Sequence, residues 1–290
     1  MATATTKVLE LVASVEALAA LGAWLRAEEE GLLLPPEVAS RVAAIVEALD
    51  VEPGTADERR AAIGAARAFS RMAMDLLEDP AREPGWTSTD PLILEATGRA
   101  SSTIADAVIE ALPHVPGLPA ATSSPGATFL DLGTGVGHLA ITMCRRFPTL
   151  RTVGVDVFAP SLTLAKENVA RSGVGDRITL REQDARDVPE REAFSLAWVP
   201  VPFLPDAILD DVLGAVFAAL RPGGLVVAGV FRPPPSPLGA RLAELRMVRS
   251  GGALVSPDAL RERITRAGFA DPVEPPLAAS TARLFFARRP

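Results

Sequence analysis

The stretch Asp131-Leu132-Gly133-Thr134-Gly135-Val136-Gly137 decides the fold. It closes an apolar run, Thr128–Leu132, and is followed directly by a segment with helical spacing that begins at His138. Glycine has no Cβ, so the backbone can turn sharply and approach a ligand closely, and a following helix presents free backbone N–H groups. The context therefore predicts a loop that binds a nucleoside cofactor, although glycine-rich turns also occur for purely structural reasons.

Apolar strands and amphipathic helices alternate downstream of this loop. Such alternation predicts an α/β fold with a Rossmann-like, doubly wound, mostly parallel sheet. After two further helices, residues 284–287 form an apolar stretch suited to an antiparallel edge strand. The expected parallel strands are 128–132, 152–157, 178–183, 195–199 and 225–231, with helices ending near residues 147, 172 and 220.

The part of the chain before the loop has helical periodicity only. Apolar residues recur at helical spacing from Val8 to Leu25, a second helix is expected from Pro35, and Thr55 with Glu58 forms a capping box for a third. Asp90 and Pro91 suit the start of a fourth helix, and the Pro-, Gly- and Ser-rich residues 113–126 suit a linker. We predict a helical cap or dimerisation region over residues 1–85 and a Rossmann-like domain over 86–290.

Composition narrows the function. The 290 residues are 48% hydrophobic and carry a net charge of -7 with scattered positive residues, which disfavours a nucleic-acid partner. The single cysteine, Cys144, excludes an internal disulfide framework, and two histidines with scattered acids give no metal cluster. Because Glu10 and Glu16 interrupt the apolar N-terminus, no run is expected to reach the ~18 residues of a membrane span. We expect a cytoplasmic protein.

Two further carboxylates follow the next two strands. Asp156 lies 19 residues after the last loop glycine (156 − 137 = 19), close to the ~20 residues expected for an acid that binds ribose hydroxyls. Asp184 follows the third strand and can accept a hydrogen bond from an adenine amine. A strand-end aspartate is often only a helix cap, but three in register, with Asp131, favour a cofactor site.

At this point the sequence resembles the class I S-adenosylmethionine-dependent methyltransferases. The motifs that carry the resemblance are FLDLGTGVGHLA, TVGVDV, ITLREQDA and LRPGGLVVAGVF, in this order, and it covers residues 95–290. It implies that S-adenosylmethionine is the cofactor, with its methionine part on the glycine loop, its ribose on Asp156 and its adenine on Asp184. The cofactor-binding residues so implied are Asp131, Gly133, Thr134, Gly135, Gly137, Asp156, Val157, Phe158, Asp184, Ala185 and Trp198.

The end of the fourth strand is almost wholly apolar from Leu196 to Pro205. In the family this strand end faces the transferred methyl group and its acceptor. It lacks the Asn/Asp-Pro-Pro-aromatic tetrapeptide with which some of these enzymes hold a planar amine, so DNA and glutamine-type substrates are disfavoured. A small aromatic or apolar metabolite of secondary metabolism is expected, with Trp86, Trp198, Phe203 and Phe231 as substrate-binding residues.

Methyl transfer from a sulfonium needs alignment and exclusion of water more than a base. If the acceptor is a hydroxyl, histidine is the natural base, and His138 beside the loop is the catalytic candidate, with a solvated helix-start residue as the alternative. His114 is the other histidine. Arg99 suits either the methionine carboxylate or a plain surface charge.

Two alternative functions stay open at the level of the sequence. A nicotinamide-dependent oxidoreductase would need glycine at position 138, where this chain has His138. A binding protein that retains the fold without catalysis is the second, and intact Asp131, Asp156 and Asp184 count against it. A homodimer through the N-terminal helices is the assembly that the helical region suggests, and the identity of the methyl acceptor is left open.

Overall fold

The computed structural model describes residues 3–277 and 282–290 and divides the chain into two units. The helical unit comprises residues 1–81 and 90–96, and the sheet unit comprises residues 82–89 and 97–290. The helix α4 (Pro91–Ala111) belongs in part to each. The sequence places a boundary between residues 85 and 86, so the two divisions differ mainly in the assignment of 90–96.

In the helical unit, α1 (Ala4–Glu30) packs against α2 (Pro36–Ala48) and α3 (Ala56–Glu78). Leu25, Val42 and Ile63 are buried where these helices meet. The predicted capping box is present, because Glu58 N donates to Thr55 Oγ1 and Thr55 N donates 2.7 Å to Glu58 Oε2. Arg59 and Arg60 of α3 both pair with Glu29 of α1, which ties the two helices together.

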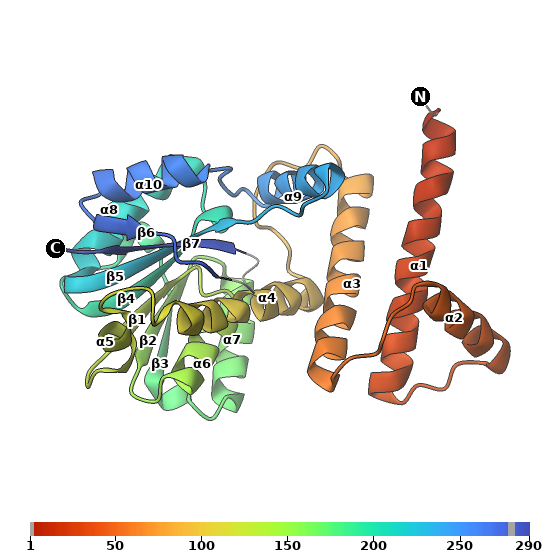
Figure 1. Cartoon of the computed structure of the whole chain (residues 1–290), viewed down its shortest axis with the longest axis horizontal. Coiled ribbons are helices and arrows are strands. Elements are labelled where there is room, and N and C mark those ends of the chain that lie inside the picture. Colours follow the sequence, from red (N-terminus) through yellow and green to blue (C-terminus); the bar gives the residue numbers. More distant parts are fainter. Residues whose placement is uncertain (1–2, 278–281) are drawn as a thin grey trace. The chain divides into compact units, whose positions relative to one another are not determined.

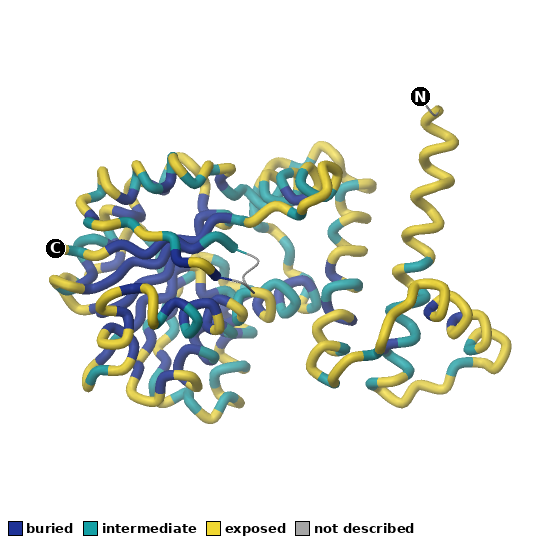
Figure 2. Tube along the Cα trace, in the orientation of Figure 1, coloured by how far each residue is buried: buried dark blue, intermediate teal, exposed yellow. Residues whose placement is uncertain are grey.

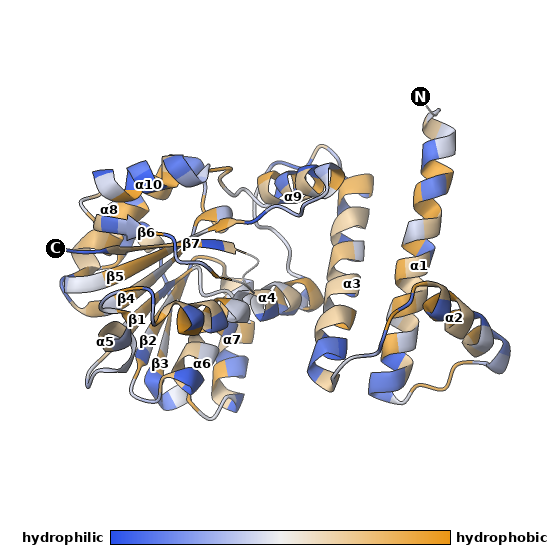
Figure 3. Cartoon of the chain, viewed as in Figure 1, coloured by the Kyte–Doolittle hydropathy of each residue, from blue (hydrophilic) through white to orange (hydrophobic). Residues whose placement is uncertain are grey.

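The helix α1 exposes apolar side chains along most of its length. Val8, Leu9 and Val15 are each more than half exposed, and Leu25 is its one buried residue. Figure 2 shows its first turns as exposed and Figure 3 shows apolar residues on them. By length and composition alone α1 could cross a membrane, with 6% of its most apolar window buried. The expectation that no run approaches that length is therefore wrong, although a signal sequence or a core helix would meet the same criterion.

The sheet unit confirms the predicted fold: a seven-stranded, mostly parallel sheet flanked by helices, in which the antiparallel strand β7 lies between β5 and the outermost strand β6 (Figure 1). The strand order is β3-β2-β1-β4-β5-β7-β6. The strands are β1 (Thr128–Leu132), β2 (Arg151–Asp156), β3 (Ile178–Glu182), β4 (Phe194–Pro200), β5 (Leu220–Phe231), β6 (Ala270–Val273) and β7 (Ala282–Arg288). The helices are α5 (Leu118–Ser123), α6 (His138–Arg146), α7 (Ala159–Arg171), α8 (Leu209–Ala219), α9 (Pro237–Arg249) and α10 (Pro257–Arg266).

Both faces of this sheet are buried, which explains why its central strands are continuous apolar runs in the sequence. Alternate residues of β1 face opposite layers: Leu130 and Leu132 join the core under α8 and α10, whereas Phe129 joins the core under α4, α5 and α6. Every residue of β4 is buried. The short 3₁₀ helices η1 (Gly175–Arg177), η2 (Ala185–Asp187), η3 (Val201–Phe203) and η4 (Asp206–Ile208) connect these elements.

Two elements were not foreseen. The helix α5 lies inside the predicted linker 113–126, where Leu118, Ala121 and Thr122 are buried against the sheet, so packing outweighed the turn-forming composition. The strand β6 contains Pro272 and pairs with β7 through an irregular register, which is where a sheet tolerates proline. Its four residues lack the regular alternation that would have marked it.

Candidate cofactor and acceptor site

The glycine loop lies at the point where the strand order reverses. β1 pairs with β2 on one side and β4 on the other, and connections from this point run in opposite directions across the sheet. Ligands of open α/β sheets bind in the crevice at the carboxyl ends of the strands at such a switch point. The topology therefore places the loop after β1 where a cofactor is expected.

Three glycines give the loop its shape. Gly133, Gly135 and Gly137 have φ values of 60°, 56° and 81°, which side-chain-bearing residues rarely adopt. Between them, Thr134 N donates 3.0 Å to Val155 O of β2, and Gly137 N donates 2.9 Å to Thr134 O. The loop is thus held by β2 as well as by its own turn, and Gly137 becomes the N-cap of α6.

Asp131 lies beneath the loop and is 1% exposed. Its Oδ2 accepts a 2.7 Å hydrogen bond from Thr134 Oγ1. Burial, with a smaller contribution from the charge of Asp156, raises the pKa of Asp131 to about 7 against the opposing effect of the Thr134 hydrogen bond. Asp131 therefore acts on the shape of the loop from below and does not present a free carboxylate to a ligand.

Asp156, at the end of β2, holds the loop from the other side. Its Oδ2 accepts from Gly135 N at 2.8 Å and its Oδ1 accepts from Phe158 N at 2.9 Å. Burial raises the pKa of Asp156, and these backbone N–H groups oppose that rise. The carboxylate keeps further lone pairs for a ligand, so the geometry fits an acid that fixes the loop and receives hydroxyl groups.

Asp184 sits after β3 and has a different environment. Arg186 forms a two-bond contact with it, with Nε to Oδ1 at 3.0 Å and Nη2 to Oδ2 at 2.8 Å. This hydrogen bond lowers the pKa of Asp184, so the group is ionised at neutral pH. Ala185, Val157 and Phe158 are partly or largely exposed beside these two acids, and their contact with an adenine ring stays a prediction.

The exit of β4 adjoins the loop. A Cβ added at Gly133 would lie 3.2 Å from Pro200 Cγ, so loop and strand exit are in contact. Beyond Pro200, Phe203 is 50% exposed and meets the Trp86 ring edge-on with 6.0 Å between ring centroids. A Cβ at Gly252 would overlap the carbonyl oxygen of Pro202, so Gly252 packs closely on this exit. We call Trp86 and residues 200–204 the acceptor edge.

The remaining residues predicted for the site lie in different environments. Trp198 is 7% exposed and packs over Gly229 in the core, so its roles toward cofactor and substrate stay predictions. Phe231 is half-buried at the end of β5. His138 has its ring against α4, Arg99 is exposed on α4, and His114 is exposed in the turn before α5. Asp131, Asp156 and the glycines are brought together.

Two residues that support the loop were missed. Gly154 of β2 lies under Thr134, whose Oγ1 would be 2.6 Å from an added Cβ. Asn168 of α7 donates 3.0 Å to Val136 O. A glycine inside a strand pattern signals close backbone approach and could have identified Gly154, whereas nothing in the sequence distinguishes Asn168 from a surface polar residue.

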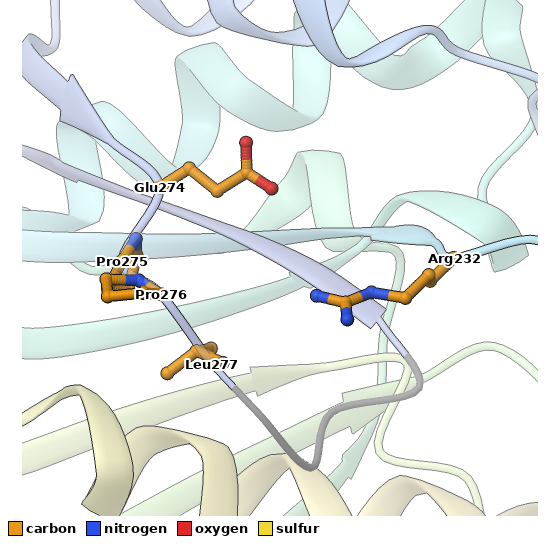
Figure 4. Close-up of a pocket in the computed structure, with 5 residues that line it drawn as sticks. All are labelled: Arg232, Glu274, Pro275, Pro276 and Leu277. Carbon is orange, nitrogen blue, oxygen red and sulfur yellow. The ribbon is translucent and has the colours of Figure 1, made fainter.

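A hollow of about 440 Å³ lies elsewhere, beside the ends of β5 and β6. Figure 4 shows Arg232 extending toward the stretch 274–277 across it. A hydrogen bond from Arg283 lowers the pKa of Glu274, and the charge of Arg232 contributes to the same shift. The residues that line this hollow are Arg232, Glu274, Pro275, Pro276 and Leu277, and none of them was predicted as a site residue.

Comparison with known proteins agrees with this geometry. Residues 129–224 match the family model described as a methyltransferase domain. A release factor glutamine methyltransferase of Rhodopirellula baltica is 28% identical over 51% of this chain and 49% of its own length. A demethylmenaquinone methyltransferase of Thermus thermophilus is 34% identical over 37% of this chain and 48% of its own length. The chain thus spans about half the length of these curated relatives.

Solved structures share the fold over nearly the whole chain. An O-methyltransferase family protein from Burkholderia thailandensis aligns with a TM-score of 0.68 at 16% identity, covering 100% of this chain and 99% of its own. Human N-acetylserotonin methyltransferase aligns with a TM-score of 0.68 at 17% identity, covering 99% and 98%. The glycine loop and the strand-end acids lie in the expected places, residues 129–224 match a methyltransferase domain, and the fold is shared with these methyltransferase structures.

Proposed function

We propose that the chain transfers the methyl group of S-adenosylmethionine to a small aromatic or apolar metabolite. The observation that carries this proposal is the contact between Gly133 of the cofactor loop and Pro200 at the start of the acceptor edge. A methyl donor held on the loop lies next to apolar side chains, which favour an apolar acceptor and exclude water.

The residues of the chain would divide the work as follows. The loop glycines let the backbone approach the methionine part, Asp156 receives the ribose hydroxyls and Asp184 the adenine amine. S-adenosylmethionine supplies a methyl group that an acceptor lone pair displaces from a sulfonium in line. The protein's own contribution is alignment of the two reactants, which supplies much of the rate in such reactions.

The acceptor edge argues against an amide or exocyclic amine as the acceptor. Side chains 200–204 are Pro, Val, Pro, Phe and Leu, so they offer a planar amide no hydrogen-bond partner. One curated relative is named for a protein glutamine, another for demethylmenaquinone. The apolar edge supports the second kind of acceptor over the first. The atom methylated and the use of a base are left open.

The first experiment is calorimetric titration of the full chain with S-adenosylmethionine, S-adenosylhomocysteine and NAD. We expect the first two to bind and NAD not to bind. Binding of NAD alone would replace the proposal with a nicotinamide-dependent oxidoreductase. Binding of none would favour a scaffold that keeps the fold without the cofactor.

The second experiment separates catalysis from binding. Protein that binds S-adenosylmethionine is incubated with the cofactor and a panel of quinones, phenols and heteroaromatic compounds with a ring nitrogen, and products are detected by mass spectrometry. Turnover is expected within this panel, and methylation of a glutamine peptide alone would contradict the apolar acceptor. His138→Ala should retain part of the turnover, and complete loss with the cofactor still bound would make His138 catalytic.

We further propose that two copies associate through α1. Its N-terminal turns expose Val8, Leu9, Val15 and other apolar side chains, and such exposure on a helix is typical of an interface. Light scattering should give twice the chain mass, and Val8→Ser with Val15→Ser should give monomers. A monomeric wild-type protein would contradict this assembly.

The expected cytoplasmic location, with neither a membrane nor a nucleic acid as partner, is kept as part of the proposal. Because α1 meets the length and composition of a membrane span, fractionation of cells expressing the chain is the direct measurement. Recovery of the protein in washed membranes would assign α1 to a bilayer and remove the basis for the dimer.

A further inference from the structure

Gly98 stands in the interior of α4, where a glycine is unfavourable. A glycine in a helix interior costs about 1 kcal/mol relative to alanine, and the surrounding residues of α4 otherwise follow the apolar spacing of a buried helix. Gly98 is buried. A residue that costs stability at a buried helical position calls for a reason in its surroundings.

The reason is the close approach of α4 to the cofactor loop. A Cβ added at Gly98 would overlap Val136 Cγ2 and would lie 2.8 Å from His138 Cδ2. Val136 is 1% exposed, so its side chain has no room to retreat. By contrast, Gly214 in α8 of the same unit has nothing within 4 Å of an added Cβ. The two helical glycines therefore differ in what they face.

Val136 is fixed on its other sides as well. Its carbonyl oxygen accepts 3.0 Å from Asn168 Nδ2 of α7. Its neighbours are Gly135, whose N–H donates to Asp156, and Gly137, which caps α6. A displacement of Val136 would pass directly to the Gly135–Asp156 hydrogen bond. Gly98 therefore affects the part of the loop that is hydrogen-bonded to Asp156, the acid proposed to bind the ribose.

We propose that Gly98 is a positioning residue for S-adenosylmethionine: its missing side chain lets α4 press Val136 and His138 into the loop conformation that binds the cofactor. The inference rests on the proposed function, because it concerns affinity for that cofactor. It adds a residue outside the loop, about 33 positions earlier in the chain than Asp131, to the set that determines cofactor binding.

The test is Gly98→Ala, with Gly214→Ala as the matched control. Calorimetry with S-adenosylmethionine should show affinity reduced at least about tenfold for Gly98→Ala, equivalent to ~1.4 kcal/mol. Gly214→Ala should bind like the wild type, because its methyl group meets nothing. An unchanged affinity of Gly98→Ala would overturn the inference. Binding of S-adenosylmethionine by the wild-type protein would still support the proposed function in that case.

A second-site variant distinguishes positioning from general damage. Val136→Ala removes the Cγ2 atom that a residue-98 Cβ would overlap. In this background Gly98→Ala should weaken binding no more than about threefold, whereas in the wild-type background it weakens it about tenfold or more. If Gly98→Ala alone does not fold, the double variant should fold and bind within about threefold of Val136→Ala, because only the 2.8 Å approach to His138 Cδ2 remains. A double variant that folds no better, or binds as poorly as Gly98→Ala, would contradict the inference.

Discussion

The two halves of the sheet's carboxyl edge are built on opposite principles. Around β1 and β2, buried carboxylates and backbone N–H groups satisfy one another, as in the contacts of Asp131 with Thr134 and Asp156 with Gly135. At the β4 exit, Pro200 to Leu204 present only apolar side chains. Enzymes that use the same cofactor need the same polar groups in the same places, whereas each methyl acceptor needs a pocket of its own shape. The polar half is therefore the part of the site that sequence motifs can identify.

The largest expected effect is on the pH dependence of stability, in the polar half. Burial raises the pKa of Asp131 to about 7 from 3.8, so the folded protein binds the proton more tightly than the unfolded chain. The stability contributed by this group is full below pH ~4 and is lost as pH rises through ~7, by roughly 4 kcal/mol in total. Asp131→Asn should remove this contribution, and denaturant unfolding at pH 5, 6, 7 and 8 measures it.

The control for that experiment is the wild type in the same buffers. Asp156, whose pKa burial also raises, imposes a slope of the same sign on both proteins. Only the difference between the two proteins therefore reports Asp131. Parallel curves for wild type and Asp131→Asn would show that Asp131 is ionised in the folded state throughout.

The next effect concerns cofactor affinity in the polar half. Asp156→Ala leaves the N–H groups of Gly135 and Phe158 without their acceptor and removes the proposed ribose contact. Loss of a charged hydrogen-bonded partner costs about 2–3 kcal/mol, or roughly 30- to 150-fold in affinity for S-adenosylmethionine. Glu182→Ala, at the paired and exposed position of β3, should leave calorimetric affinity unchanged. Equal affinity for Asp156→Ala would remove the ribose assignment.

A smaller effect tests the apolar half. The edge-on contact of Trp86 with Phe203 should contribute about 1 kcal/mol of coupling in a double-mutant cycle of unfolding. The Phe217–Phe269 pair, with ring centroids 5.1 Å apart, is the matched cycle away from the edge. Both cycles should show coupling, and only the first should alter acceptor methylation. If substitution of Trp86 or Phe203 also changed the affinity for the cofactor, the polar and apolar halves would not act independently.

The smallest effect concerns Asp184, whose side chain is 27% exposed. Its contact with Arg186 is a surface ion pair, which typically contributes below 1 kcal/mol. Asp184→Asn should weaken S-adenosylmethionine binding by only about threefold and leave the unfolding midpoint unchanged. Asp187→Asn, a nearby exposed acid, is the control. A loss as large as that of Asp156→Ala would make the adenine contact equal to the ribose contact.

The sequence predicted the sheet and the loop because both are local. The signals that predicted them are apolar runs of strand length, the glycine spacing and the position of Asp156, and each involves residues close together in the chain. The structure confirms the fold. Contacts between distant segments were not predictable: the burial of α5, the packing of Gly252 on Pro202 and the approach of Gly98 to Val136 each join segments far apart in the chain. Trp198 is 7% exposed and packs over Gly229, so burial in the core is the part of its environment that the sequence did not indicate, and its contacts with cofactor and substrate stay predictions.

The helix α4 carries a consequence for energetic linkage. Its residues 91–96 belong to the helical unit, and Gly98, two positions later, touches the cofactor loop. Binding free energies are reciprocal, so whatever change cofactor binding makes in the ordering of this helix, ordering the helix makes in cofactor binding. The ordering of α4 near Gly98 and the affinity for the methyl donor are then linked by one coupling free energy.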